Sequence, residues 1–342
     1  MANLPSYPYK ALDFGATLEV APGIHWLRMP MPFPLDHINL WLLEDGDSWT
    51  IVDTGYNTET VRGLWHELFS TLLASKPISR LFVTHFHPDH MSLAGWFVDE
   101  LGADLWMSHA EWLQAHVNQG DGVTSDLERR VAFYRLHGLD DEAIEGYRAS
   151  RPDFANVLLP VPDTFRRIGQ GDEITIGGRV WRVITGGGHS PEHASLWCED
   201  ANVLISGDQV LPRITSHVSV FYYEPDGDPL RQFLASFDGF RHLPDDVLVL
   251  PSHNLPFHGL HDRLDAITEH HRDRLEVCHD ACAEPRTAVE LIGAIFSRRP
   301  LDAMQTTFAF GETLAHTNYL VADGRLRKQS GSDDRIRFRK AE

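Results

Sequence analysis

Apolar residues in the first half of the chain come in short runs that turn residues interrupt. The runs GIHWLRMP, HINLWLLED, WTIVDTG and RLFVTHF are bounded by Gly, Pro or Asp, as β-strands often are. Further along, DEITIGGRVWRVITGG repeats the pattern around Gly177 and Gly178, and HASLWCED, ANVLISGD and DVLVLPSH follow it. These runs predict strands, and the two glycines predict a hairpin.

Helical spacing of apolar residues appears between these runs. It covers residues 58–75, where Thr58 is a suitable N-cap, and residues 91–102, which end at a glycine. Residues 109–166 contain three helical patterns with no strand between them. We interpret 109–166 as a helical insertion, and insertions of this kind often cover active sites.

The C-terminal part of the sequence has a different pattern. A long helix is expected from Leu260 to about Ala283, followed by two helical segments, TAVELIGAIFS and GETLAHTNYLVADG. The last segment, RLRKQSGSDDRIRFRK, is typical of a hairpin. Helices followed by such a hairpin suggest a winged-helix-like module. We therefore predict a main domain over 1–259 and a linking helix with a C-terminal module over 260–342.

Composition and charge narrow the classes of partner. Of 342 residues, 42% are hydrophobic and 23% are charged, which is ordinary for a globular protein. The net charge of −19 argues against nucleic acid or an anionic membrane as the main partner. Residues 321–342 carry seven basic and four acidic residues, so nucleic-acid binding by this tail is one interpretation. Packing or homodimer formation is the interpretation that the overall charge favours.

The sequence also predicts a cytoplasmic protein. No stretch approaches the roughly 20 apolar residues of a membrane span, and MANLPSYPYKALDFG lacks the apolar core of a signal peptide. The sequence has three cysteines, Cys198, Cys278 and Cys282. A number this small and odd does not indicate a disulfide framework. Cys278 and Cys282 lack a second pair of ligands at zinc spacing, so we interpret them as structural thiols.

The stretch THFHPDH, residues 84–90, places three imidazoles and a carboxylate between a predicted strand and a predicted helix. His85 and His87 point the same way in an extended chain, because side chains alternate with a period of two. Pro88 turns the chain before Asp89 and His90. We interpret the stretch as ligands for two adjacent metal ions, with a solvated loop as the alternative.

Four other predicted strands also end at a metal-binding residue. Asp53 follows WTIV, His189 follows VWRVITGGG, Asp208 follows NVLISG, and His253 follows DVLVLPS. Five strand ends of this kind make the solvated-loop alternative weak.

The order Asp, HxHxDH, His, Asp, His resembles the metallo-β-lactamase-fold hydrolase superfamily, over roughly residues 15–258. The tail from about residue 260 resembles the winged-helix appendage of some glyoxalase-II-like and endoribonuclease-like members. The resemblance implies an α/β (α+β) fold, a four-layer αββα sandwich with metal ions at its edge.

The resemblance also implies a role for each motif residue. His85, His87 and His189 would bind a first metal ion, Asp89, His90 and His253 would bind a second, and Asp208 would bridge both. Asp53 would orient a metal ligand through a hydrogen bond. Imidazole and carboxylate ligands favour two zinc ions, with iron or manganese as alternatives.

The implied reaction is hydrolysis. A metal-bridging hydroxide would attack the carbonyl of a small-molecule ester, thioester or lactone, and Asp89 or a metal-bound water would return the proton. Three other functions are compatible with the same residues. These are an endoribonuclease that binds RNA through its tail, a mononuclear iron oxygenase acting on a sulfur substrate, and a β-lactamase.

Residues outside the motifs suggest where a substrate binds. Met31 and Phe33 lie in a proline-rich apolar loop, and His193, Arg213 and Tyr223 follow the motifs; we consider these five as substrate-binding candidates. The family's Pro-Gly-His-Gly is here PSHN, so side chains replace two glycines beside His253. The adjacent His270 and His271 lie on a charged helix, and we expect them to be solvated.

Overall fold

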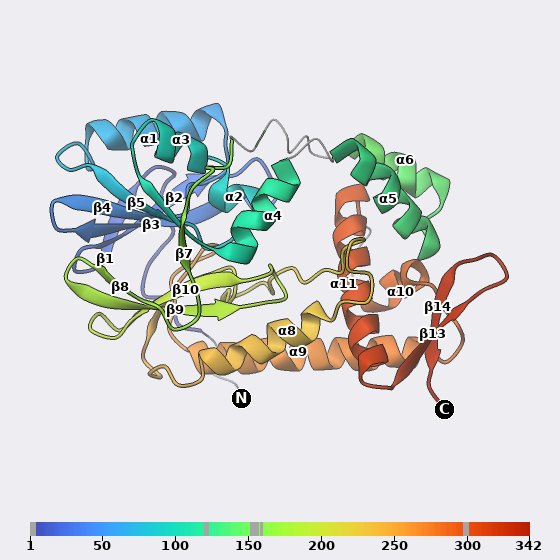
Figure 1. Cartoon of the computed structure of the whole chain (residues 1–342). Helices are drawn as coiled ribbons and strands as arrows, with labels where there is room; N and C mark the ends of the chain where they lie inside the picture. Colours follow the sequence, from blue (N-terminus) through green and yellow to red (C-terminus); the bar gives the residue numbers. More distant parts are fainter. Residues whose placement is uncertain (1–4, 120–122, 151–156, 158–159, 297–300) are drawn as a thin grey trace. The chain divides into compact units, whose positions relative to one another are not determined.

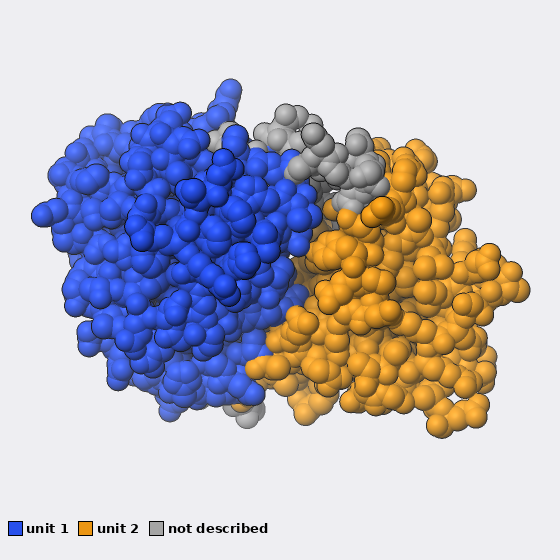
Figure 2. Space-filling model, in the orientation of Figure 1, with its two compact units in different colours: residues 1–120, 153–216, 236–264 blue, residues 121–152, 217–235, 265–342 orange. Residues whose placement is uncertain are grey.

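The computed structural model describes residues 5–119, 123–150, 157, 160–296 and 301–342, which form two compact units (Figure 2). Unit 1 comprises residues 1–120, 153–216 and 236–264, and unit 2 comprises residues 121–152, 217–235 and 265–342. Each unit is therefore assembled from three separate stretches of the chain.

A seven-stranded sheet forms one half of unit 1. Its strands lie in chain order: β1 (Thr17–Ala21), β2 (Ile24–Pro30), β3 (His37–Asp45), β4 (Ser48–Val52), β5 (Ile78–Phe82), β6 (Asp104–Ser108) and β7 (Arg166–Ile168). The first four strands pair antiparallel, and β4 to β7 pair parallel. The carboxyl ends of β4 and β5 therefore lie at the same edge.

A five-stranded sheet forms the other half, in the order β12 (Leu248–Pro251), β11 (Val203–Gly207), β10 (His193–Cys198), β9 (Arg179–Gly186) and β8 (Glu173–Ile176). β11 and β12 are parallel, and the remaining pairs are antiparallel. The predicted hairpin at Gly177 and Gly178 joins β8 to β9. Gly177 has φ +61°, and a Cβ there would lie 2.4 Å from the Glu44 carbonyl oxygen, so glycine is required.

The two sheets pack face to face, and helices of unit 1 cover the outer face of the seven-stranded sheet (Figure 1). Trp26, Trp41 and Phe82 of the first sheet pack with the second sheet in one core, which includes Trp181 and Leu196. On the other face of the first sheet, α1 (Glu59–Ser70) and α3 (Ala94–Asp99) form a second core. A 3-10 helix, η1 (Phe237–Gly239), lies against β9. The predicted four-layer sandwich is confirmed.

The helices of unit 1 follow the sequence pattern with one difference. Thr58 caps α1 by accepting a hydrogen bond from the backbone N–H of Val61, as predicted. The helix predicted over residues 91–102 is shorter, because Leu93 is not helical: α2 (Pro88–Met91) ends at the first residue of this range, and α3 begins at Ala94. The predicted insertion divides between the units, with α4 (His109–Gln119) in unit 1.

Unit 2 is mainly helical. It contains α5 (Val123–Leu136), α6 (Asp141–Ser150), α10 (Ala288–Ile295), α11 (Ala303–Ala322), and most of α8 (Pro229–Ser236) and α9 (Leu260–Ala281). The predicted terminal hairpin is confirmed as β13 (Leu326–Ser330) and β14 (Ile336–Lys340). Aromatic contacts of Phe133 and Tyr134 with Phe310 join α5 to α11. The winged-helix assignment stays a prediction.

The expectation that His271 is solvated is wrong. Its side chain is fully buried, because it lies on the same helical face as Ile267, Leu275 and Cys278, which are also buried. The charged residues of α9 occupy its other faces, so the overall polarity of the segment hides this stripe. Cys198, Cys278 and Cys282 are buried free thiols. Among the described residues, no helix has both the length and the apolar character that crossing a membrane requires.

Candidate metal centre

Five strand ends of unit 1 bring their polar residues to one edge of the sandwich. β4 runs parallel to β5, β11 runs parallel to β12, and β9 points the same way as β11 because both pair antiparallel with β10. Seven of the motif residues form overlapping groups whose ligand atoms lie within 4.8 Å of one another: His85, His87, Asp89, His90, His189, Asp208 and His253. The two sheets thus bring together residues up to 168 positions apart.

The first group consists of three imidazoles. His85 Nε2 lies 2.8 Å from His87 Nδ1 and 3.2 Å from His189 Nε2. Burial, followed by the neighbouring His90, His87 and His189 rings, holds the pKa of His85 well below its usual range. Neutral imidazoles present lone pairs, so the three rings can bind one cation.

The second group combines a carboxylate with two imidazoles. Asp89 Oδ2 lies 3.5 Å from His90 Nε2 and 3.4 Å from His253 Nε2. Burial raises the pKa of Asp89, but His90 and His253 outweigh it and lower the value to about 2. Burial lowers the pKa of His90, but the carboxylates of Asp89, Asp53 and Asp208 outweigh it and raise the value to about 9. A metal cation here would supply the positive charge that a proton otherwise provides.

Asp208 lies between the two groups and offers one oxygen to each. Its Oδ2 is 3.4 Å from His189 Nε2, whereas its Oδ1 is 3.6 Å from His90 Nε2 and 3.5 Å from His253 Nε2. Burial opposes ionisation, yet His253 and His90 hold the pKa of this carboxyl well below its usual range. This position makes Asp208 a candidate metal ligand within reach of both groups.

Unsatisfied atoms support this interpretation. His90 Nε2 and Asp208 Oδ1 are buried and have no hydrogen-bond partner among the described residues. Buried polar atoms without a partner are costly and rare. Their separations from the other ligand atoms, 3.5 to 3.6 Å, are too long for good hydrogen bonds. They resemble the distances between ligands of one ion, because atoms 2.0–2.1 Å from a tetrahedral zinc lie roughly 3.3 Å apart.

Hydrogen bonds orient the ligand rings. Asp53 accepts hydrogen bonds from the Thr84 backbone N–H and hydroxyl, at 2.8 and 2.9 Å, and from His90 Nδ1 at 2.8 Å. This leaves His90 Nε2 facing the centre, which is the orienting role that the resemblance implied for Asp53. His253 Nδ1 likewise donates to the His37 carbonyl at 2.9 Å.

Glu111, at the start of α4, is a site residue that the sequence analysis missed. It is fully buried and accepts three hydrogen bonds: from the Phe86 N–H at 3.0 Å, the Ser190 hydroxyl at 2.6 Å and the Glu192 N–H at 2.7 Å. Phe86 lies between His85 and His87, and Ser190 follows His189. One carboxylate therefore ties together the two loops that carry the first group. Burial raises the pKa of Glu111 to about 7, while the three donors act in the opposite direction.

The predicted substrate-binding residues are found in different places. Met31 packs partly buried against the outer core of the first sheet. Phe33 contacts Tyr56 edge to face, with ring centroids 5.1 Å apart. Burial and then the Asp89 carboxylate raise the pKa of Tyr56, so this ring lies close to the second group. Phe33 and Tyr56 thus form an aromatic pair, and Tyr56 was not predicted.

The other three candidates are less directly placed. His193 is fully buried beneath the centre, where its Nε2 accepts the Asp208 backbone N–H at 3.1 Å. That position supports the end of β11 rather than facing a substrate. Arg213 is exposed and lies over the Tyr7 ring, 5.2 Å from its centroid. Tyr223 belongs to unit 2, where it stacks on Phe221.

The side chains that replace glycine beside His253 are accommodated in two ways. Ser252 is buried and has a negative φ. Asn254 has φ +70°, and asparagine is one of few residues other than glycine that adopt this conformation readily. Its N–H donates to His37 Nε2 at 2.9 Å, and its carbonyl accepts from Asn39 at 2.8 Å. The backbone of Asn254, not its side chain, therefore makes these contacts.

We expect Asn254→Gly to leave the free energy of unfolding within about 0.5 kcal/mol of the wild type, because glycine tolerates a positive φ and keeps both backbone hydrogen bonds. Asn254→Ala should lower it by about 1 kcal/mol, since alanine pays the cost of the left-handed conformation. Urea unfolding of both variants measures the difference. An alanine variant as stable as the wild type would contradict the backbone explanation.

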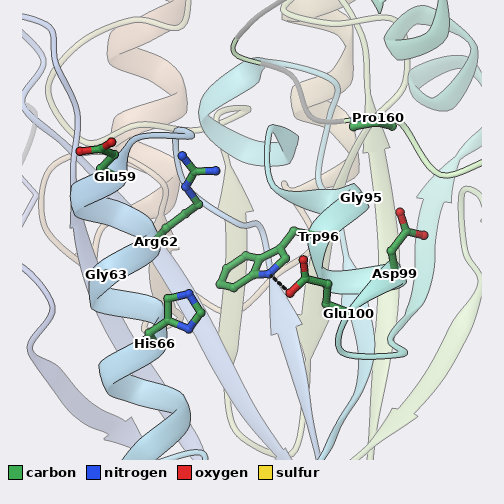
Figure 3. Close-up of a pocket in the computed structure, with 9 residues that line it drawn as sticks. All are labelled: Glu59, Arg62, Gly63, His66, Gly95, Trp96, Asp99, Glu100 and Pro160. Carbon is green, nitrogen blue, oxygen red and sulfur yellow. Dashed lines mark hydrogen bonds between the residues drawn. The ribbon is translucent and has the colours of Figure 1, made fainter.

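A groove of about 640 Å³ lies on the outer helical layer of unit 1, between α1 and α3 (Figure 3). His66 of α1 contacts the ring of Trp96 of α3, with centroids 5.3 Å apart, and Trp96 donates to Glu100. None of the seven clustered ligands lines this groove. It is therefore separate from the metal centre.

Comparison with known families finds two matches along the chain. Residues 34–253 match the family described as the metallo-beta-lactamase superfamily, and this range includes all seven clustered residues. Residues 275–341 match a family described as a metallo-beta-lactamase-like C-terminal domain. The first match covers β3 to β12 and the clustered residues, and the second covers the C-terminal part of unit 2.

Individual relatives extend over different shares of the chain. The crystal structure of a beta-lactamase domain protein from Burkholderia ambifaria is 42% identical, with TM-score 0.91 and 98% of each chain covered. A probable metallo-hydrolase of Bacillus subtilis (strain 168) is 24% identical, covering 87% of this chain and 92% of the relative. An atrochrysone carboxyl ACP thioesterase of Paecilomyces divaricatus is 26% identical, covering 54% of this chain and 43% of the relative.

Proposed function

The chain belongs to the metallo-β-lactamase superfamily, and from this premise we propose that it is a dinuclear metal-dependent hydrolase. Its substrate is a small molecule with an ester, thioester or lactone bond. The observation that carries the proposal is the position of Asp208, which offers Oδ2 to His189 of the first group and Oδ1 to His90 and His253 of the second.

Two ions suit the ligand set better than one. His85, His87 and His189 supply three nitrogens, and Asp89, His90 and His253 supply an oxygen and two nitrogens. Zinc accepts such ligands in four- or five-coordinate sites. Bound divalent ions would polarise the substrate carbonyl and lower the pKa of water toward neutrality.

The chain itself orients the ligands and handles the proton. Asp53 and the His37 carbonyl fix the rings of His90 and His253 through their Nδ1 atoms. The Asp89 side chain is 17% exposed, against 10% for Asp208 and 2% for Asp53, so it is the acid of the centre that is most accessible to solvent. Asp89 is assigned to take a proton from the attacking water and to return it to the leaving group.

The surroundings of the centre favour an acyl substrate. Phe33 and Tyr56 provide an aromatic wall beside Asp89 that suits an apolar acyl or aromatic group. The name of the thioesterase relative supports thioester chemistry on this fold, although the match covers less than half of that protein. The net charge of −19 disfavours RNA as the substrate.

The test measures hydrolysis of several types of bond by the protein, before and after its metal is removed. The purified chain is assayed with p-nitrophenyl acetate, an acyl-thioester, a lactone, an aryl sulfate, a β-lactam and single-stranded RNA. We expect hydrolysis of at least one acyl substrate, a fall of at least about 100-fold after chelation, and recovery when zinc is added.

Two results would overturn the proposal in different ways. Full activity in the chelated protein would exclude the metal-dependent mechanism. Turnover of the sulfate, the β-lactam or RNA without turnover of an ester, thioester or lactone would exclude the proposed bond class. Elemental analysis of the active enzyme gives the number of metal ions per chain. Fewer than two ions bound to the ligands of unit 1 would contradict a dinuclear centre.

A further inference from the structure

We propose that unit 2 carries a separate metal site, in which His271, Glu312 and His316 bind one divalent transition-metal ion, zinc by its donor set. The three residues offer ligand atoms that all lie within 4.8 Å of one another. His271 belongs to α9 and the other two to α11, so an ion would link these helices. The proposal is independent of the function proposed for unit 1.

The helices present these residues to one point. Glu312 and His316 are four positions apart on α11, which places them on the same helical face. His271 and His316 are fully buried, and the Glu312 side chain is 14% exposed. The site is thus enclosed but retains a partly open side, from which an ion can enter and where water can complete the coordination.

The distance between the rings matches a shared ion better than a hydrogen bond. His271 Nδ1 lies 3.3 Å from His316 Nε2, beyond the usual 2.7–3.2 Å range for a hydrogen bond from N–H. Two nitrogens bound to one tetrahedral zinc lie roughly 3.3 Å apart. In the metal centre of unit 1, His189 Nε2 and His85 Nε2 have a similar separation, 3.2 Å.

A carbonyl of its own helix determines which ring nitrogen of His316 carries the proton. Its Nδ1 lies 2.7 Å from the Glu312 carbonyl oxygen, which only accepts, so Nδ1 carries the proton and Nε2 keeps its lone pair. A backbone carbonyl that holds the second nitrogen of a ligand histidine is a common feature of metal sites. Burial lowers the pKa of His316 to about 4 and that of His271 to about 2, so both rings are neutral at neutral pH.

Protein partners leave this cluster only partly satisfied. His271 Nε2, the ring nitrogen other than the proposed ligand atom Nδ1, is also buried and has no hydrogen-bond partner within the described ranges. Arg274 Nη1 lies 3.4 Å from Glu312 Oε1, longer than a strong charge-assisted hydrogen bond, and this leaves the second carboxylate oxygen for an ion. The Arg274 guanidinium, which lies over the Phe296 ring, opposes cation binding, and the carboxylate offsets it.

Zinc stoichiometry in the full-length protein tests the site. After dialysis against zinc, elemental analysis compares the wild type with His271→Asn and His316→Asn, and with His270→Asn as a matched control on the same helix. We expect each of the first two variants to lose about one ion per chain, with acyl hydrolysis within about twofold of the wild type. The control should keep the wild-type count. Unchanged zinc in the folded His271→Asn and His316→Asn variants would overturn the proposal.

A second measurement leaves the cluster intact, in case these variants do not fold. His85→Ala, Asp208→Ala and His253→Ala are combined to disable the centre of unit 1, and the protein is titrated with Co²⁺. Retention of about one cobalt per chain, with the visible absorption of a nitrogen-ligated ion, supports the site. A protein that retains no cobalt contradicts it.

Discussion

Asp208→Ala is expected to abolish most of the hydrolytic activity, lowering kcat/KM by a factor on the order of 10³ or more. The substitution removes a carboxylate that faces both ligand groups, with Oδ2 near His189 and Oδ1 near His90 and His253. Metal ions contribute several kcal/mol of transition-state stabilisation in such sites. Because each ~1.4 kcal/mol is a factor of ten in rate, loss of that contribution gives the stated fall.

Metal titration separates this effect from general damage. In Asp208→Ala both ions of unit 1 should bind more weakly, whereas His87→Ala should weaken only the ion held by His85, His87 and His189. Asp200→Ala, in the exposed turn between β10 and β11, is the matched control and should keep full activity. An Asp208→Ala variant that still binds both ions and reacts within about tenfold of the wild type would exclude a bridging role.

Much of the fold of unit 1 could be predicted, because the elements that its local sequence patterns indicate are the ones that the sandwich contains. Strand runs ended at turn residues, Thr58 capped its helix, and two glycines made the hairpin that joins β8 to β9. The metal ligands followed the same logic. The segments that carry the candidate ligands follow the ends of strands, and parallel strands place their carboxyl ends at one edge, so their order in the sequence indicated that they lie close together.

Features that depend on long-range contacts could not be predicted. Glu111 has no motif around it, and its role comes from hydrogen bonds to residues 25, 79 and 81 positions away. The contact of Tyr56 with Phe33 and the influence of the Asp89 carboxylate on it likewise join residues that are far apart in the sequence. His271 was hidden because α9 is charged on its outer faces, and the buried stripe is visible only with the helix phase known.

The grouping of residues 217–235 with unit 2 is another long-range effect. Asn318 of α11 donates to the carbonyls of Pro225 and Gly227, at 3.0 and 2.9 Å, and Val220 N–H donates to the Gly311 carbonyl at 3.2 Å. These bonds join segments about 90 residues apart. Hydrophobic periodicity describes single elements and holds no information on such pairings.

Glu111→Ala is expected to weaken the first metal ion of unit 1 selectively. The substitution leaves the buried N–H groups of Phe86 and Glu192 and the Ser190 hydroxyl without their acceptor. Each unsatisfied group costs about 1–3 kcal/mol, which frees the loops that carry His85, His87 and His189. Loss of a partner in the outer shell typically costs about 10–100-fold in metal affinity, and we expect a fall of that size in both zinc affinity and kcat/KM.

The isosteric variant makes the prediction sharper. Glu111 Oε1 accepts from Ser190 and Glu192, and Oε2 accepts from Phe86, so Glu111→Gln can keep the first two bonds but turns an NH₂ group toward the Phe86 N–H. The zinc affinity and kcat/KM of Glu111→Gln should therefore lie between those of the wild type and those of Glu111→Ala.

Glu67→Ala, on the exposed face of α1, is the control that should change neither the zinc affinity nor kcat/KM. Stepwise zinc titration, with His87→Ala identifying the first site, distinguishes the outcomes. An equal loss at both sites would mean that Glu111 stabilises the fold in general, because a carboxylate that positions only the loops of the first group leaves the second unchanged.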